Sequence, residues 1–308
     1  MTSNPPSGAQ WEISSGRQRA VVVEVGGGLR EYTVDDWAVL DGYPADRMAD
    51  GGRGQPLLPW PNRLADGQYT FNGQQLQLPI DEVAHNNAMH GLTRWHNWQL
   101  IASSASSVRV GHVVHPRAGY PFTLALEIEY ALDEDLGLTV RTRAHNRGTT
   151  PLPFGAGQHP YFSVGTPSVD AALLHVPARG HVELEPERLL PTGRIGQIAG
   201  GALDYTTPRL IGAAVVDDCF CDLVRDVDGQ ARVSLSEPPS GRRLTVWVGG
   251  RYRYVQVFTG DTLAPERRRQ GLAIEPMTCP PNAFRTGTDV ITLDPDESVD
   301  LEWGVTPG

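Results

Sequence analysis

Short runs in which apolar and polar residues alternate recur along most of the chain. Each run is bounded by Gly, Pro, Asp or Asn, and long runs with helical periodicity are nearly absent. A period of two places successive side chains on opposite faces of a strand, so the pattern is typical of half-buried antiparallel strands joined by turns. We therefore predict an all-β fold, a large antiparallel β-sandwich. The clearest runs are residues 108–110, 124–128, 138–143, 233–235, 244–248 and 254–258.

The ends of the predicted domain follow from composition. Residues 1–16 are polar with paired prolines, which predicts a loose N-terminal segment. Residues 17–308 contain no low-complexity linker and no fixed-period repeat, so we expect a single domain. The first strand is predicted at 21–25, closed by a turn at 26–28. Those glycines are not a dinucleotide fingerprint, because no helical pattern follows them.

Composition and charge narrow the classes of function. Hydrophobic residues make up 40% of the chain, enough for a sizeable core, and the net charge of −10 argues against a nucleic-acid partner. No apolar run reaches the ~18 residues of a membrane span, and no signal-peptide pattern opens the chain. We expect a cytoplasmic protein with no membrane partner. Cys219, Cys221 and Cys279 are too few for a disulfide framework, and the spacing of the first two does not suit a zinc pair.

The segment 54–98 departs from the strand pattern. It is dense in aromatic rings, amides, histidines and arginines, among them Asn62, Arg63, Arg94 and Trp95. Indole faces stack on the apolar face of a sugar, and amide and guanidinium groups hydrogen-bond its hydroxyls, so the segment suggests a carbohydrate site. The alternative is a Trp-rich core loop. The spacing of the three histidines here (His85, His90 and His96) fits no common metal-ligand pattern, so we expect no metal.

Two titratable residues, His159 and Glu275, have the same local sequence feature. His159 precedes Pro160, and Glu275 follows Leu-Ala-Ile and precedes Pro276. A proline restricts the preceding residue to extended backbone, so both side chains are held at fixed positions. Partial burial would raise the pKa of Glu275 and make it a better base. The alternatives are a core histidine and a glutamate in a salt bridge at the rim.

Taken together, several motifs resemble the aldose 1-epimerase (galactose mutarotase) family. They occur in the family's order and span about residues 21 to 303. The matching motifs are Pro61-Asn62-Arg63 with the residues up to Gly73, Asn87-Ala88-Met89-His90-Gly91, Gly119-Tyr120-Pro121-Phe122, Gly157-Gln158-His159-Pro160-Tyr161-Phe162, Asp217-Asp218-Cys219-Phe220, and Ile274-Glu275-Pro276 with Pro281-Asn282-Ala283.

The resemblance implies a galactose mutarotase-like supersandwich with its site in a cleft on one sheet, and neither a metal nor an organic cofactor. It implies that Glu275 is the general base and His159 the general acid. His90 and Arg63 match residues that hold the ring oxygen and the anomeric region. Asp217 matches an acid that binds sugar hydroxyls, although its neighbour Asp218 stays an alternative.

The function implied is aldose 1-epimerase, an isomerase of free sugars acting as a monomer or homodimer. Arg94 departs from a glycine-rich continuation common in the family, which leaves the sugar open. A hexose-6-phosphate 1-epimerase is one alternative, in which Arg94, beside Arg63 and Arg53, clamps the phosphate. A glycoside hydrolase using Glu275 and Asp217 is a second. A non-catalytic carbohydrate-binding protein is a third.

Overall fold

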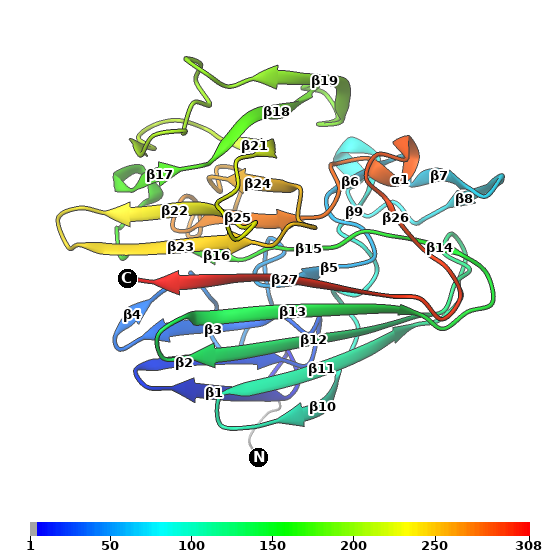
Figure 1. Ribbon diagram of the computed structural model, residues 1–308, viewed down its shortest axis with the longest axis horizontal. Helices are drawn as coiled ribbons and strands as arrows, with labels where there is room; N and C mark the ends of the chain where they lie inside the picture. Colours follow the sequence, from blue (N-terminus) through cyan, green and yellow to red (C-terminus); the bar gives the residue numbers. More distant parts are fainter. Residues whose placement is uncertain (1–4) are drawn as a thin grey trace.

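The computed structural model describes residues 5–308, and over this range the named strands pair antiparallel to form an all-β sandwich. The largest sheet crosses Figure 1 from β10 through β27 to β17. Its nine strands are, in spatial order, β10 (Gln99–Ser103), β11 (Ser107–Val114), β12 (Leu124–Asp133), β13 (Gly137–Asn146), β27 (Ser298–Pro307), β23 (Arg242–Val248), β22 (Ala231–Glu237), β17 (Leu173–His175) and β20 (Arg209–Leu210).

A second sheet of eight strands forms part of the other layer and carries the candidate site. It consists of β19 (Pro191–Gln197), β18 (Ala178–Leu184), β21 (Asp217–Leu223), β24 (Tyr254–Phe258), β25 (Leu272–Met277), β15 (Gly157–Gln158) and β5 (Pro56–Leu57) in that order, with β16 (Tyr161–Phe162) also paired to β25. A four-stranded sheet comprises β1 (Gln10–Ser15), β2 (Gln18–Val23), β3 (Leu29–Val34) and β4 (Trp37–Ala38).

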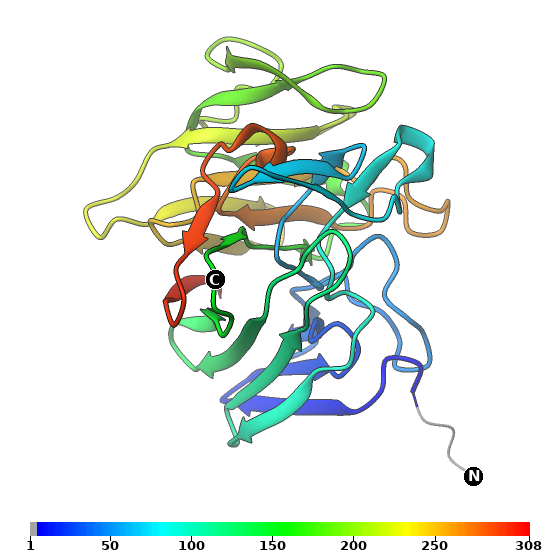
Figure 2. The ribbon, with the colours of Figure 1, turned by 90° about the vertical axis from the view of Figure 1, so that its right-hand side faces the viewer.

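The remaining elements are short. Figures 1 and 2 show that several of them lie near one end of the sandwich, namely β6, β7, β8, β9 and α1. The elements are the pairs β6 (Arg63–Ala65) with β9 (Asn87–Met89), β7 (Gln68–Phe71) with β8 (Gln74–Gln77) and β14 (Leu152–Phe154) with β26 (Ile291–Leu293), the helix α1 (Ala283–Thr286), and the 3₁₀ turns η1 (Val83–His85) and η2 (Val169–Ala171). None of the helices within residues 5–308 has the length and apolar character needed to cross a membrane.

Alternating burial explains why the predicted strands form. Leu124, Leu126, Ile128 and Tyr130 of β12 are all buried, and the residues between them are partly exposed. Burying each such side chain stabilises the fold by roughly 1.5–3 kcal/mol. All six predicted alternating runs lie within strands, namely β11, β12, β13, β22, β23 and β24, and the predicted fold class is confirmed.

The predicted loose segment 1–16 is wrong for residues 10–15. These residues form β1, which pairs with β2 in register along its whole length. The apolar residues Trp11 and Ile13 alternate with Glu12, and Ile13 is buried in the core. This run was too short for its period to stand out from the polar residues around it. Residues 1–4 lie outside the described residues.

Candidate active site

The register of β25 places His159 across from Glu275. Tyr161 pairs with Ala273 and Gly157 pairs with Met277, so the same antiparallel register puts residue 159 opposite residue 275. Pro160 and Pro276 lie in the interval between these two short pairings. A proline donates no backbone hydrogen bond, so such an interruption is where a sheet tolerates it. The two prolines noted in the sequence therefore flank one meeting point.

The two side chains meet at the bottom of a cavity. His159 Nε2 lies 3.3 Å from Glu275 Oε1, and the residues are only 5% and 2% exposed. Among residues 5–308, His159 Nδ1 and Glu275 Oε2 are buried atoms without a hydrogen-bond partner. Unpaired buried polar atoms are costly to the fold, so their presence at one point indicates a site for a polar ligand.

Backbone contacts hold His159 in place. Its N–H donates to the carbonyl oxygen of Gln55 (3.0 Å), and its own carbonyl accepts from the N–H of Gly54 (2.8 Å). The imidazole stacks on the Tyr161 ring with centroids 4.9 Å apart. Gly52, with φ +75°, lies so close that a Cβ there would stand 2.9 Å from His159 Cδ2. The imidazole therefore packs directly against Gly52, at a position where a side chain would not fit.

Burial opposes charge on both members of the pair. Burial, assisted by the positive charges of Arg53 and Arg94, lowers the pKa of His159 to about 3. Burial and then the neighbouring Asp217 carboxylate raise the pKa of Glu275 well above its usual value, while Arg63 opposes the rise. The two groups are coupled, so between these limits they hold one proton in total. One shared proton is what a pair needs to act as acid and base together.

The cavity above the pair has a volume of about 420 Å³. It brings together the eight site residues predicted from the sequence, which come from segments far apart along the chain. These residues are Asn62, Arg63, His90, Arg94, Trp95, His159, Asp217 and Glu275.

Asn62 and His90 are joined by two hydrogen bonds. Both have positive φ (+58° and +62°), and the N–H of His90 donates to the carbonyl of Asn62 (3.0 Å). The N–H of Asn62 donates to His90 Nδ1 (3.1 Å). Burial and the charges of Arg94, His159 and Arg63 lower the pKa of His90, so the ring is neutral. With Nδ1 accepting, the proton sits on Nε2, and that nitrogen is a hydrogen-bond donor.

Arg63 is oriented by a carboxylate. Its Nε lies 3.0 Å from both oxygens of Glu82, and no protein partner within residues 5–308 engages its terminal nitrogens. The guanidinium has five N–H donors in a fixed plane. It can therefore donate further hydrogen bonds to a ligand in the cavity.

Strand alternation separates Asp217 from Asp218. Asp217 lines the cavity and its Oδ1 accepts from Gln256 Nε2 (2.6 Å), whereas Asp218 Oδ1 lies 3.2 Å from His181 Nδ1. Burial raises the pKa of Asp217, and Arg63 partly offsets this. Of the two candidates, Asp217 is the one that a ligand in the cavity can reach.

Arg94 and Trp95 stand at the rim. Arg94 Nη2 lies 3.3 Å from Asp81 Oδ2, and the Trp95 ring is 62% exposed, so it is no core residue. Arg53, grouped with them from the sequence, does not line the cavity. Its guanidinium is buried in ion pairs with Asp41 (2.7 Å) and Asp50 (3.0 Å) and lies over the Tyr161 ring. Of the two arginines expected beside Arg94 in the phosphate alternative, Arg63 lines the cavity and Arg53 does not.

Two further residues of the site, Gln256 and Glu82, were not predicted from the sequence. Gln256 is 1% exposed and bridges Asp217 to Asn62, with its Oε1 3.5 Å from Asn62 Nδ2. A polar residue in the middle of an apolar strand was an available signal for it. Glu82 left no such signal, because its importance comes only from its contact with Arg63.

The remaining histidines and cysteines make no metal centre in the described part of the chain. His85 lies beside Glu82, and His96 stacks near His112 outside the main cavity. Over residues 5–308, no cluster of three His, Cys, Asp or Glu side chains could hold a metal ion. The three cysteines are free and buried.

Comparisons with known proteins agree with the fold and the motifs. The model of the aldose 1-epimerase family matches residues 9–306. The uncharacterized protein YihR of Escherichia coli is 35% identical over 288 residues, which cover 94% of this chain and 90% of that protein. Galactose mutarotase of Rattus norvegicus is 29% identical over 217 residues, covering 66% of this chain and 60% of its own.

Solved structures share the fold at lower identity. A putative aldose 1-epimerase from Escherichia coli superposes with a TM-score of 0.82 at 23% identity, covering 97% of this chain and 99% of that one. A GalM/aldose epimerase homologue from C. elegans superposes with a TM-score of 0.86 at 16% identity, covering 97% and 98%. The family match over nearly the whole length confirms the resemblance: the chain belongs to the aldose 1-epimerase family.

Proposed function

We propose that the protein interconverts the α and β anomers of a free aldose. The observation that carries this proposal is the contact between His159 and Glu275 at 3.3 Å, below a cavity of about 420 Å³. The reaction requires only proton transfers, which an imidazole and a carboxyl group supply. Membership of the aldose 1-epimerase family supports the same assignment.

The proposed cycle begins with Glu275 as the base. Its carboxylate takes the proton of the C1 hydroxyl while His159 protonates the ring oxygen, and the C1–O5 bond breaks to give the open-chain aldehyde. Rotation about C1–C2 presents the other face of the carbonyl. His159 then takes back the proton from O5 as it attacks C1, and Glu275 returns a proton to O1. The pair ends with the one proton it began with.

The other lining residues would bind the sugar. Arg63 and the Nε2–H of His90 supply hydrogen-bond donors for the ring oxygen and the anomeric region. Asp217 accepts hydrogen bonds from sugar hydroxyls, and Trp95 offers an apolar face at the rim. Asn62 and Arg94 complete the lining.

The charges around the cavity favour a neutral sugar. Arg63 is paired with Glu82 and Arg94 with Asp81, so each cavity guanidinium already faces a carboxylate. A sugar phosphate would bring a dianion to a cavity whose two arginines already face carboxylates, which costs binding free energy. Comparing glucose with glucose 6-phosphate within a rate panel of galactose, glucose, xylose, arabinose and rhamnose tests this choice.

Polarimetric mutarotation, corrected for the uncatalysed rate, tests the mechanism. Glu275→Gln and His159→Asn are each expected to lower kcat by roughly 10²–10⁴-fold. The double variant should lose little more, because the two groups act as one unit. Wild-type rates in either single variant would remove the mechanism, whereas sugar binding without catalysis in the wild-type protein would favour a binding protein.

The pH profile gives an independent readout. The pKa of His159 is lowered to about 3, so the pair gains a second proton only near pH 3, and the pKa of Glu275 is raised well above its usual value by burial. The value of kcat/KM should therefore show no acid limb until the pH falls toward 3. An acid limb centred near the ordinary imidazole pKa, ~6.5, would contradict this reading.

A further inference from the structure

The turn that joins β18 to β19 is built as a rigid support for one arginine. The Glu185 carboxylate accepts hydrogen bonds from the backbone N–H groups of Glu187 (2.9 Å) and Arg188 (2.9 Å). The N–H of Leu189 donates to the carbonyl of Glu185 (3.0 Å). Arg188 projects from this turn and does not line the cavity. The family motifs and the acid–base chemistry leave it without a role.

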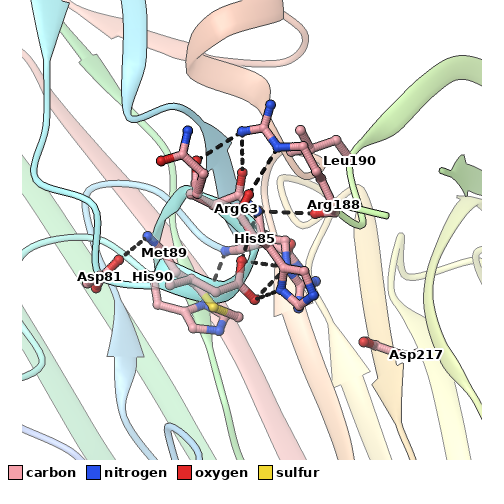
Figure 3. Close-up of polar contacts among 12 residues, drawn as sticks. Arg63, Asp81, His85, Met89, His90, Arg188, Leu190 and Asp217 are labelled. Atoms are coloured by element: carbon pink, nitrogen blue, oxygen red, sulfur yellow. Dashed lines mark hydrogen bonds and ion pairs between the residues drawn. The ribbon is translucent and has the colours of Figure 1, made fainter. Parts of the chain in front are cut away.

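Arg188 reaches across to the cavity rim, about a hundred positions away along the chain. Its Nε donates to the carbonyl of His85 (3.0 Å), and its Nη2 donates to the carbonyl of Asn86 (2.9 Å) and to Asp66 Oδ1 (2.8 Å). Figure 3 shows these contacts beside Arg63 and His85. Charge-assisted hydrogen bonds of this kind are about twice as strong as neutral ones. Together they fasten the turn to the residues around η1.

The contacts continue from Arg188 to Arg63 through Asn87, which is buried, and Glu82, which is partly exposed. Asn87 Nδ2 donates both to the carbonyl of Arg188 (3.1 Å) and to Glu82 Oε2 (2.8 Å). Asn87 is fully buried, so its amide has few alternative positions. Glu82 in turn holds Arg63 Nε with both carboxylate oxygens (3.0 Å each). Each link is a direct hydrogen bond between residues that pack together.

We propose that Arg188 is a positioning residue: it latches the rim segment 82–87 so that Glu82 holds the Arg63 guanidinium in the cavity. This inference rests on the proposed function, since Arg63 is there assigned to the sugar ring. The planar fork of Arg188 serves four acceptors with Nε and Nη2, the fourth being Asn87 Oδ1 (3.4 Å), a geometry that a lysine ammonium cannot reproduce. Loss of the latch lets the rim segment move, and a shift of about 1 Å in a binding group can lower activity by roughly 100-fold.

The test compares Arg188→Met with Arg194→Met. Arg194 lies in the same hairpin, but its side chain is 75% exposed and, within residues 5–308, pairs only with Glu183 of that hairpin (2.7 Å). Amide hydrogen exchange of residues 82–89 should become faster in Arg188→Met and stay unchanged in Arg194→Met. The value of kcat/KM should fall by up to roughly 100-fold in Arg188→Met only. Arg188→Lys, a milder change, should move both readouts in the same direction by less.

A double-mutant cycle separates positioning from general structural damage. In an Arg63→Met background, Arg188→Met should lower kcat/KM little further, because both changes remove the same contribution. Full additivity would overturn the positioning role, and unchanged exchange at residues 82–89 in Arg188→Met would overturn the latch. A wild-type protein without mutarotase activity would instead refute the proposed function, and the exchange data would still decide whether the latch exists.

Discussion

At the scale of single residues, the geometry of the site depends on a glycine as well as on the functional side chains. Gly52 has φ +75° and lies against His159, and a Cβ there would stand 2.9 Å from His159 Cδ2. Because that contact is closer than real Cβ atoms allow, Gly52→Ala must push the imidazole away from Glu275. We expect kcat to fall by roughly 10- to 100-fold, measured by polarimetry.

Gly73 is the matched control for this substitution. It has a similar positive φ, +77°, but a Cβ there would meet no atom of residues 5–308 within 4 Å. Both Ala variants should lose about 1–2 kcal/mol of unfolding free energy from the left-handed backbone alone. Only Gly52→Ala should lose activity. Equal activity losses in the two variants would mean that backbone strain, and not the position of His159, governs the rate.

At the scale of elements, a single strand divides two neighbouring acids between two environments. In β21, Asp217 points to the cavity and Gln256, whereas Asp218 contacts His181. Asp217→Asn should raise KM by roughly 10- to 100-fold, the range expected for hydrogen bonds to a charged group. Asp218→Asn should leave KM and kcat unchanged. The opposite result would place the sugar on the other face of the strand.

The hydrogen-bond partners of β25 explain why the site lies where it does. On one side, β25 pairs continuously with β24 and places Gln256 beside Glu275. On the other side, it pairs first with β16 and then with β15, and His159 falls in the interval. The interruption that accommodates two prolines is thus also what leaves room for two titratable side chains to face a ligand.

At the scale of the whole molecule, a buried ion-pair network joins distant parts of the chain beneath the site. Asp41 accepts from Arg53 (2.7 Å) and from Arg267 (3.0 Å), and Arg53 is 2% exposed and lies over the Tyr161 ring. Asp41→Asn leaves a buried guanidinium without its main counter-charge. We expect the free energy of unfolding, from urea titration, to fall by about 3–5 kcal/mol.

The comparison for this prediction is an exposed ion pair. Asp300 lies 3.3 Å from Arg143, with side-chain exposures of 71% and 52%. Asp300→Asn should lower the unfolding free energy by less than about 1 kcal/mol, because water screens the pair. If Asp41→Asn proved as mild as Asp300→Asn, the buried network would be incidental to stability.

The amino-acid sequence by itself determined the fold class and pointed to most of the residues that line the candidate site. Alternation of apolar and polar residues is a local property, so β12 and β13 could be recognised without any partner. His159 and Glu275 could be singled out because each precedes a proline, and the motifs around Arg63 and His90 indicated the family. The short strand β1 could not be recognised in this way, because its apolar and polar residues alternate over too few positions.

Only the tertiary structure decided which residues meet. The register of β25 against β15 and β16 brings His159 to Glu275, and no local pattern encodes a pairing between positions more than a hundred residues apart. No local pattern indicated either that Asp217, and not Asp218, lines the cavity, or that Arg53 is buried in ion pairs. The contacts of Glu82 and Arg188 likewise became visible only in the folded chain. Each of these depends on a partner that long-range strand pairing supplies, and that is the physical reason the sequence alone left them open.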